Sequence, residues 1–232
     1  MYLTALLFFL STVLLFLAAF YFGKKLVFNE VAYGTGNDTK AKKSEKIWKY
    51  YCVLSVLLIC FIASVHPGFA FHTLFFLHYI ILLSGLISIV DVFTHNLYLE
   101  QLPLLLLFIP IGCISFGIQN SVYGLLAGLC LNGAIVLLEL ILRGRKSYGG
   151  GDFMFGTLSS ALIGIQYVYY YWIIVSFFMI VWFIFFLAKD SITHRRLHFE
   201  NRMVPLLPLL SLSMIITYVA AAARYLPPII GE

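Results

Sequence analysis

Charged residues are scarce in this chain: only 11% of its 232 residues are Asp, Glu, Lys or Arg. A soluble domain carries charge on about a quarter of its residues, so an ordinary soluble domain is excluded. Cysteine is also rare, and none of the four forms a C-x-x-C pair. The sequence therefore suggests neither a zinc ribbon nor a disulfide framework. The six histidines contain no H-E-x-x-H, so we expect no bound metal.

Most of the sequence consists of long apolar runs, since 62% of its residues are hydrophobic. Runs of about 20 apolar residues are typical of membrane-spanning helices, whereas a barrel would alternate in segments of about ten residues. The runs here are continuous, so we predict an all-α fold: a polytopic transmembrane helical bundle of about eight spans, in one membrane domain, 1–232. The expected helices are 3–22, 50–65, 72–90, 102–118, 121–142, 153–165, 168–188 and 205–222.

The basic residues predict which way the chain faces. Eight spans place 23–49, 143–152 and 189–204 on one side, and these three segments hold 14 of the 15 Lys and Arg residues. The positive-inside rule makes that side cytoplasmic and both termini external. The segment 23–49 is then expected to be a flexible basic cytoplasmic loop. The net positive charge needs no nucleic-acid partner.

Two of the ten acids stand at the mouths of predicted helices on this same side. Asp91 follows the apolar run 80–90, and Asp152 follows Gly149, Gly150 and Gly151. An acid near membrane depth is costly and is therefore a functional candidate. Two close carboxylates would share a proton, an arrangement suited to peptide hydrolysis without metal or cofactor. The spacing alone is equally consistent with two simpler roles: Asp152 could cap a helix, and Asp91 could be a solvated loop residue.

The three glycines and the remaining acids have simpler expected roles. Glycines before a helix permit backbone angles that other residues resist, and they let a substrate backbone approach closely. Glu30 is assigned to a polar loop, together with Asp38 and Glu45. Glu100, between the third and fourth predicted helices, is expected to be a solvated charge.

Three stretches, in order, resemble motifs of the type IV prepilin peptidases, a family of membrane aspartyl proteases. Tyr148-Gly-Gly-Gly-Asp-Phe-Met-Phe-Gly156 is similar to the G-x-G-D signature. Asp91-Val-Phe-Thr-His-Asn-Leu-Tyr-Leu99 matches the family pattern D-x-x-T-x-x-(I/L)-P at Asp91, Thr94 and Leu97. Pro205-Leu-Leu-Pro-Leu-Leu210 resembles the family's P-x-x-P-F-L segment. The resemblance covers roughly 80–220, the expected catalytic core.

The resemblance implies an aspartyl endopeptidase in a bacterial cytoplasmic membrane. Asp91 and Asp152 would be catalytic, and Gly149, Gly151 and Thr94 would shape the site. The substrate partner would be a prepilin or pseudopilin, cut at the cytoplasmic face where its short basic leader ends.

The sequence departs from the family in three places. Tyr98 replaces the proline of the first motif, Met154 replaces a lysine after the second, and the cysteine-rich cytoplasmic domain of the larger members is absent. Those larger members also methylate the new N-terminus with S-adenosylmethionine, an activity not expected here. Three alternatives stay open: a peptidase for archaeal flagellin precursors, a proton or cation transporter that uses the same two acids, and a non-catalytic assembly component of a secretion system that keeps the fold.

Overall fold

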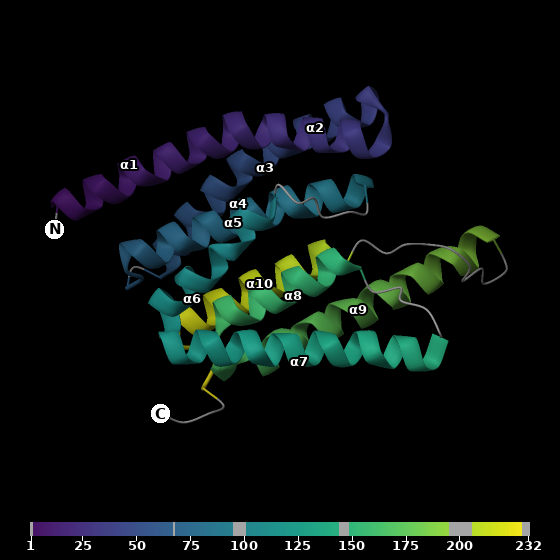
Figure 1. Cartoon of the computed structure of the whole chain (residues 1–232). Coiled ribbons are helices and arrows are strands. Elements are labelled where there is room, and N and C mark those ends of the chain that lie inside the picture. The colour runs from purple at the N-terminus through teal and green to yellow at the C-terminus, as the bar shows by residue number, and fades with distance from the viewer. Residues whose placement is uncertain (1, 67, 95–100, 144–148, 195–205, 229–232) are drawn as a thin grey trace.

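The computed structural model describes residues 2–66, 68–94, 101–143, 149–194 and 206–228, and all regular structure in these ranges is helical. This confirms the predicted all-α class. Figure 1 shows the helices running back and forth along one long axis, with the start of α1 and the end of α10 at the same end of the bundle. The elements are α1 (Tyr2–Ala18), η1 (Ala19–Gly23), α2 (Lys24–Thr35), α3 (Asp38–Val65), α4 (Phe71–Thr94), α5 (Leu102–Leu106), α6 (Phe108–Phe116), α7 (Ile118–Arg143), α8 (Gly150–Ile163), α9 (Ile165–His194) and α10 (Leu207–Ala222).

Five stretches of helix in the described ranges are long and apolar enough to cross a membrane. They are Leu10–Thr35, Asp38–Val65, Phe71–Thr94, Ile118–Leu142 and Ile165–Phe185. The mean hydropathy of the most apolar 18 residues in each runs from 1.6 to 2.3. Helices of this length and composition indicate a membrane protein. The prediction of about eight spans is not confirmed.

The other three predicted spans are short helices. The 14 residues of α8 and the 16 of α10 extend only ~21 and ~24 Å, less than the ~30 Å of a hydrocarbon core. The third, predicted over 102–118, is divided between α5 and α6. The hydropathy of the sequence does not distinguish such short helices from full spans, because a helix buried within the bundle is also apolar.

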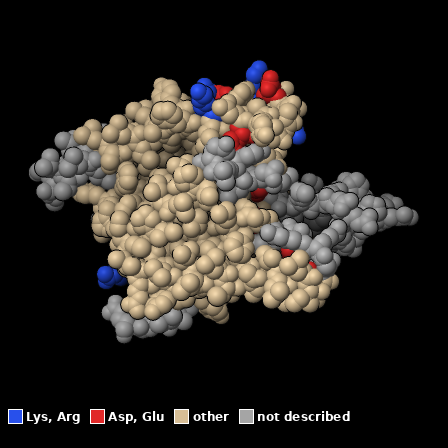
Figure 2. Space-filling model, viewed as in Figure 1, with Lys and Arg blue, Asp and Glu red and all other residues tan. Residues whose placement is uncertain are grey.

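The segment predicted as a flexible loop, 23–49, is helical. It consists of α2 and the first part of α3, joined by a tight turn at Gly36 and Asn37. Gly36 ends α2 in the left-handed region at φ 59°, a conformation that glycine adopts without strain. The Asn37 side chain accepts hydrogen bonds from the N–H groups of Thr39 and Lys40, at 2.9 and 3.1 Å, and so caps α3. In Figure 2 most of the visible Lys and Arg atoms gather over this part of the molecule.

A π-helical turn joins α1 to α2 where Trp48 of α3 packs against it. The Trp48 indole Nε1–H donates to the Ala19 carbonyl oxygen at 3.1 Å. A Cβ built on Gly23 would lie 2.6 Å from the same ring. The Trp48 ring therefore fits because the Ala19 carbonyl of the π-turn accepts its N–H and because position 23 carries no Cβ. These contacts pack the π-turn that follows α1 against α3.

Small residues hold α8 tightly against α7. Cβ atoms added at Gly124 or Gly128 of α7 would collide with Ser160 of α8. The Asn132 side-chain amide lies between the helices, donating to the Gly128 carbonyl at 2.8 Å and to the Thr157 hydroxyl at 3.3 Å. Close backbone approach and buried amide bonds are how helices associate in membranes. This packing positions the start of α8, and Asp152 with it.

Candidate functional site

Asp91 lies in the last turn of α4, where its side chain is 6% exposed. Its Oδ2 accepts a hydrogen bond from the backbone N–H of Leu207 at 3.3 Å. Leu207 is the first residue of α10, so the carboxyl group lies at a helix N-terminus, where unpaired N–H groups and the helix dipole favour an acid. Asp91 is thus a buried group in a polar niche and not a solvated loop residue.

Asp152 lies in the first turn of α8 and is half-buried. Burial raises the pKa of Asp152 from 3.8 to about 6, and the nearby negative charge of Asp91 adds to this rise. A hydrogen bond from the backbone N–H of Gly149 acts in the opposite direction and lowers the pKa. The two acids, 61 positions apart in sequence, are therefore close enough for one charge to act on the other.

We expect the pKa of Asp152 to fall when the charge of Asp91 is removed. Carbodiimides modify protonated carboxyls, so labelling of Asp152 in the wild type should decline as the pH rises through about 6. In Asp91→Asn the midpoint should move to lower pH, because burial still raises the pKa but the like charge no longer does. Peptide mass spectrometry across pH 4–9 measures both midpoints. Unchanged labelling in Asp91→Asn would mean that the two carboxyl groups do not interact.

The glycines before Asp152 provide space and not unusual backbone angles. Gly149 has φ −67° and ψ 144°, values open to any residue. Among the described glycines, positive φ occurs at Gly36, Gly117 and Gly164. A Cβ on Gly149 would lie 2.8 Å from Asp152 Oδ2, whereas one on Gly150 would meet nothing within 4 Å. The prediction that Gly149 adopts backbone angles other residues resist is therefore wrong. Gly149 instead leaves room for the Asp152 carboxyl group to lie close to the backbone.

The other motif residues are placed as follows. Thr94, the last residue of α4, donates its hydroxyl hydrogen bond to the Val90 carbonyl at 2.9 Å. Met154 is 41% exposed on α8, and Gly151 lies in the first turn of the same helix. Tyr98 and Pro205 lie outside the described residues. The third motif reaches the site through Leu207, which contacts Asp91.

One buried acid was assigned wrongly from the sequence. Glu30, expected in a solvated loop, is a residue of α2 that is only 6% exposed. Its Oε2 accepts a hydrogen bond from Gln101 Nε2 at 3.4 Å, and Gln101 is fully buried. The spacing Val27, Glu30, Val31 could have revealed it, because positions i, i+3 and i+4 share one face of a helix, and both valines are buried.

In the part of the chain that is described, no group of three or more His, Cys, Asp or Glu side chains could hold a metal ion.

Comparison with known proteins gives no relative. No family model, no curated protein and no solved structure matches this chain.

Proposed function

We propose that this chain is a membrane-embedded aspartyl endopeptidase that removes the short basic leader of type IV prepilins or pseudopilins at the cytoplasmic membrane face. The observation that carries the proposal is that Asp91 and Asp152, a buried and a half-buried acid of two separate helices, are close enough for the charge of Asp91 to raise the pKa of Asp152. Each also stands in a stretch that resembles a prepilin peptidase motif. N-methylation with S-adenosylmethionine is not part of the proposal.

The pair acts as one acid–base unit that holds a single proton. The ionised carboxyl group takes a proton from water as the water oxygen bonds to the scissile carbonyl carbon. The protonated partner gives its proton to the carbonyl oxygen, so a neutral gem-diol forms. The carboxyl group that is now protonated gives its proton to the amide nitrogen, while the other, now ionised, takes a proton from one hydroxyl of the gem-diol. The C–N bond then breaks, and the leader's carboxylic acid and the mature subunit's amine are released. Removing one charge would shift the pKa of the other group, as the effect of Asp91 on Asp152 indicates.

The surroundings of the pair suit this chemistry. The Leu207 N–H holds Asp91 at 3.3 Å, and the Gly149 N–H holds Asp152, so both carboxyl groups are oriented by backbone donors that cannot titrate. Partial burial keeps bulk water away and strengthens the interaction between the groups. Two acids at one site also attract a basic leader.

The test is cleavage by purified protein in vesicles. We expect wild-type protein to convert a prepilin to its mature form with one new N-terminus, read by mass spectrometry. Preferential cleavage of an archaeal flagellin precursor would support the alternative peptidase. Absence of cleavage of every precursor, together with cation or proton uptake that is lost in Asp91→Asn, would replace the proposal with the transporter.

A further inference from the structure

A groove of about 340 Å³ runs between α3, α4 and α10. Val92 and Phe93, which follow Asp91 on α4, line it. So does Pro208, which follows the Leu207 that donates to the Asp91 carboxyl group. Most of the wall is apolar, and Ser84, Ser88 and Ser211 add hydroxyl groups along its length. The groove therefore runs along the same turns of α4 and α10 that hold Asp91 and Leu207, although neither of these two residues lines it.

Ser84 carries a hydroxyl group that the protein does not satisfy. Its side chain is 1% exposed, and its Oγ has no hydrogen-bond partner. Other buried hydroxyls donate to the carbonyl one turn earlier, as Ser160 does to Gly156 at 2.9 Å. The Ile81 carbonyl, one turn before Ser84, accepts the Tyr51 hydroxyl at 2.8 Å. A buried polar group without a partner is unfavourable, so a hydrogen-bonding occupant would be favoured.

The serines at the deeper wall leave room for a backbone. Ser88 and Ser211 bond to each other at 3.2 Å across α4 and α10, and small side chains of this kind let another helix approach closely. Ser84 precedes Ser88 by one turn on α4. The Ser88 hydroxyl already donates to Ser211, so Ser84 is the member of this pair that can donate to a backbone carbonyl of a peptide. A lipid acyl chain has no acceptor to offer.

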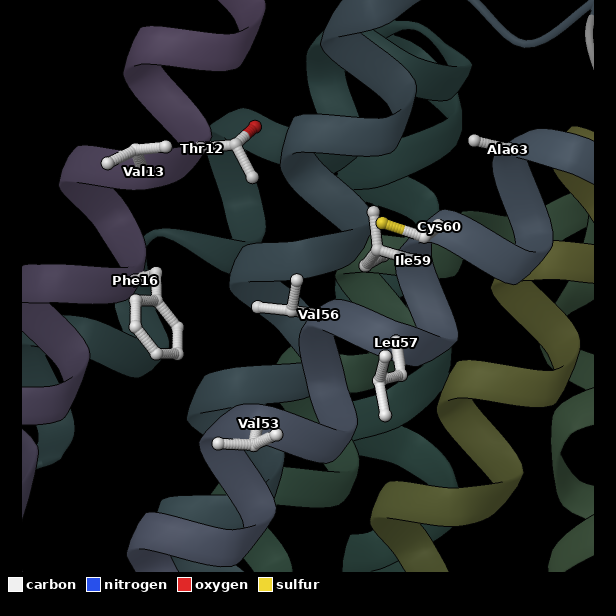
Figure 3. A pocket seen from close by; sticks show the side chains of 9 residues that line it. All are labelled: Thr12, Val13, Phe16, Val53, Val56, Leu57, Ile59, Cys60 and Ala63. Carbon is white, nitrogen blue, oxygen red and sulfur yellow. The ribbon is translucent and has the colours of Figure 1, made fainter.

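A second crevice on the protein provides a contrast. It has a similar volume of about 360 Å³ and lies between α1 and α3, lined by residues of these two helices (Figure 3). Its surface is formed by carbon groups and the Cys60 sulfur, and the Thr12 hydroxyl, like that of Ser84, is buried without a hydrogen-bond partner. No residue of α4, α8 or α10 lines this crevice, so it does not adjoin the acids. It serves as a matched control site.

We propose that the groove between α3, α4 and α10 binds the apolar helix of the protein substrate, just beyond the bond to be cut. The inference rests on the proposed function and adds the place where the substrate helix lies. Ser84 donates to a backbone carbonyl of that helix, which satisfies its buried hydroxyl group. The scissile bond, at the start of the apolar segment, then falls beside Asp91.

Filling the groove should weaken binding of the whole substrate without harming the acids. We expect Ser88→Leu to raise KM for a full-length prepilin at least tenfold. Cleavage of a short peptide that spans the scissile bond but lacks the apolar helix should be unchanged. Ser84→Ala should raise KM about threefold to tenfold. The control Ala63→Leu fills the α1–α3 crevice and should change neither the KM for prepilin nor the cleavage of the short peptide. An unchanged KM for prepilin in Ser88→Leu would overturn the inference while leaving the peptidase intact.

A binding measurement separates this inference from the proposed function, because it needs no cleavage. A prepilin with a photoactivatable residue in its apolar helix is added to vesicles that contain the protein, and crosslinks are mapped by mass spectrometry. Crosslinks to α4 and α10 that Ser88→Leu suppresses would support the inference even if no product forms. Crosslinks confined to α1 and α3 would overturn it. Labelling of the groove by a photoactivatable phospholipid that excess prepilin does not reduce would also overturn it.

Discussion

Replacing Asp91 or Asp152 by Asn is expected to reduce leader cleavage at least about 10³-fold, since each carboxyl performs a proton transfer that an amide cannot. The double variant should be no worse than either single one, because the two acids act as a unit. Asn has nearly the same volume as Asp, and its amide oxygen can still accept the Leu207 N–H at position 91. Product formation in vesicles, with melting temperatures for each variant, measures the effect.

The matched control for this pair is Asp38→Asn. Asp38 begins α3 and is exposed, and its substitution should leave cleavage within about twofold of wild type, as for most surface changes. If Asp91→Asn or Asp152→Asn retained more than a tenth of wild-type activity while the control behaved as expected, that acid would have a structural role. The aspartyl mechanism would then fail.

Substituting Gly149 by Ala is expected to lower kcat about 10²-fold with little loss of stability. The added Cβ would lie 2.8 Å from Asp152 Oδ2, so the carboxyl group must rotate away. A catalytic group displaced by about 1 Å can cost about 10² in rate. The backbone angles at Gly149 suit alanine, so the protein should still fold. Initial rates at saturating prepilin, together with thermal melting, separate the two effects.

Gly150→Ala is the adjacent control. A Cβ at Gly150 meets nothing within 4 Å, and alanine favours the helix that begins there. Equal losses in the two variants would mean that the glycine run serves something other than the position of Asp152. A normal rate in Gly149→Ala would show that the carboxyl group tolerates the displacement.

The sequence predicted most helices because a long apolar run has few other stable forms in a membrane. It failed at 23–49, where lysines and a Gly-Asn pair were interpreted as a loop. Gly36 and Asn37 are a helix C-terminal signal and an N-cap signal in succession, the mark of a two-helix hairpin. The polar composition described the surface of these helices and not a lack of structure.

The site was predictable only in part. Alternating helix directions place Asp91 and Asp152 at one end of a bundle, and the motifs singled out both residues. The hydrogen bond between Asp91 and Leu207 joins positions 116 apart, and the Tyr51 hydroxyl of α3 donates to the Ile81 carbonyl of α4, 30 positions away. Contacts of this kind follow from tertiary packing, which residue spacing does not encode.

The short length of α10 has a consequence for the surrounding lipid. Leu212 and Ile216 on this helix are 43% and 39% exposed, while the helix extends only ~24 Å against a hydrocarbon core of ~30 Å. We expect a bilayer that meets this face to thin locally, at a cost of fractions of a kcal/mol for each Å of mismatch. Headgroups and water would then come closer to the end of α10 that holds Asp91. Hydrophobic mismatch would thereby bring the aqueous phase to a buried acid without any opening of the protein.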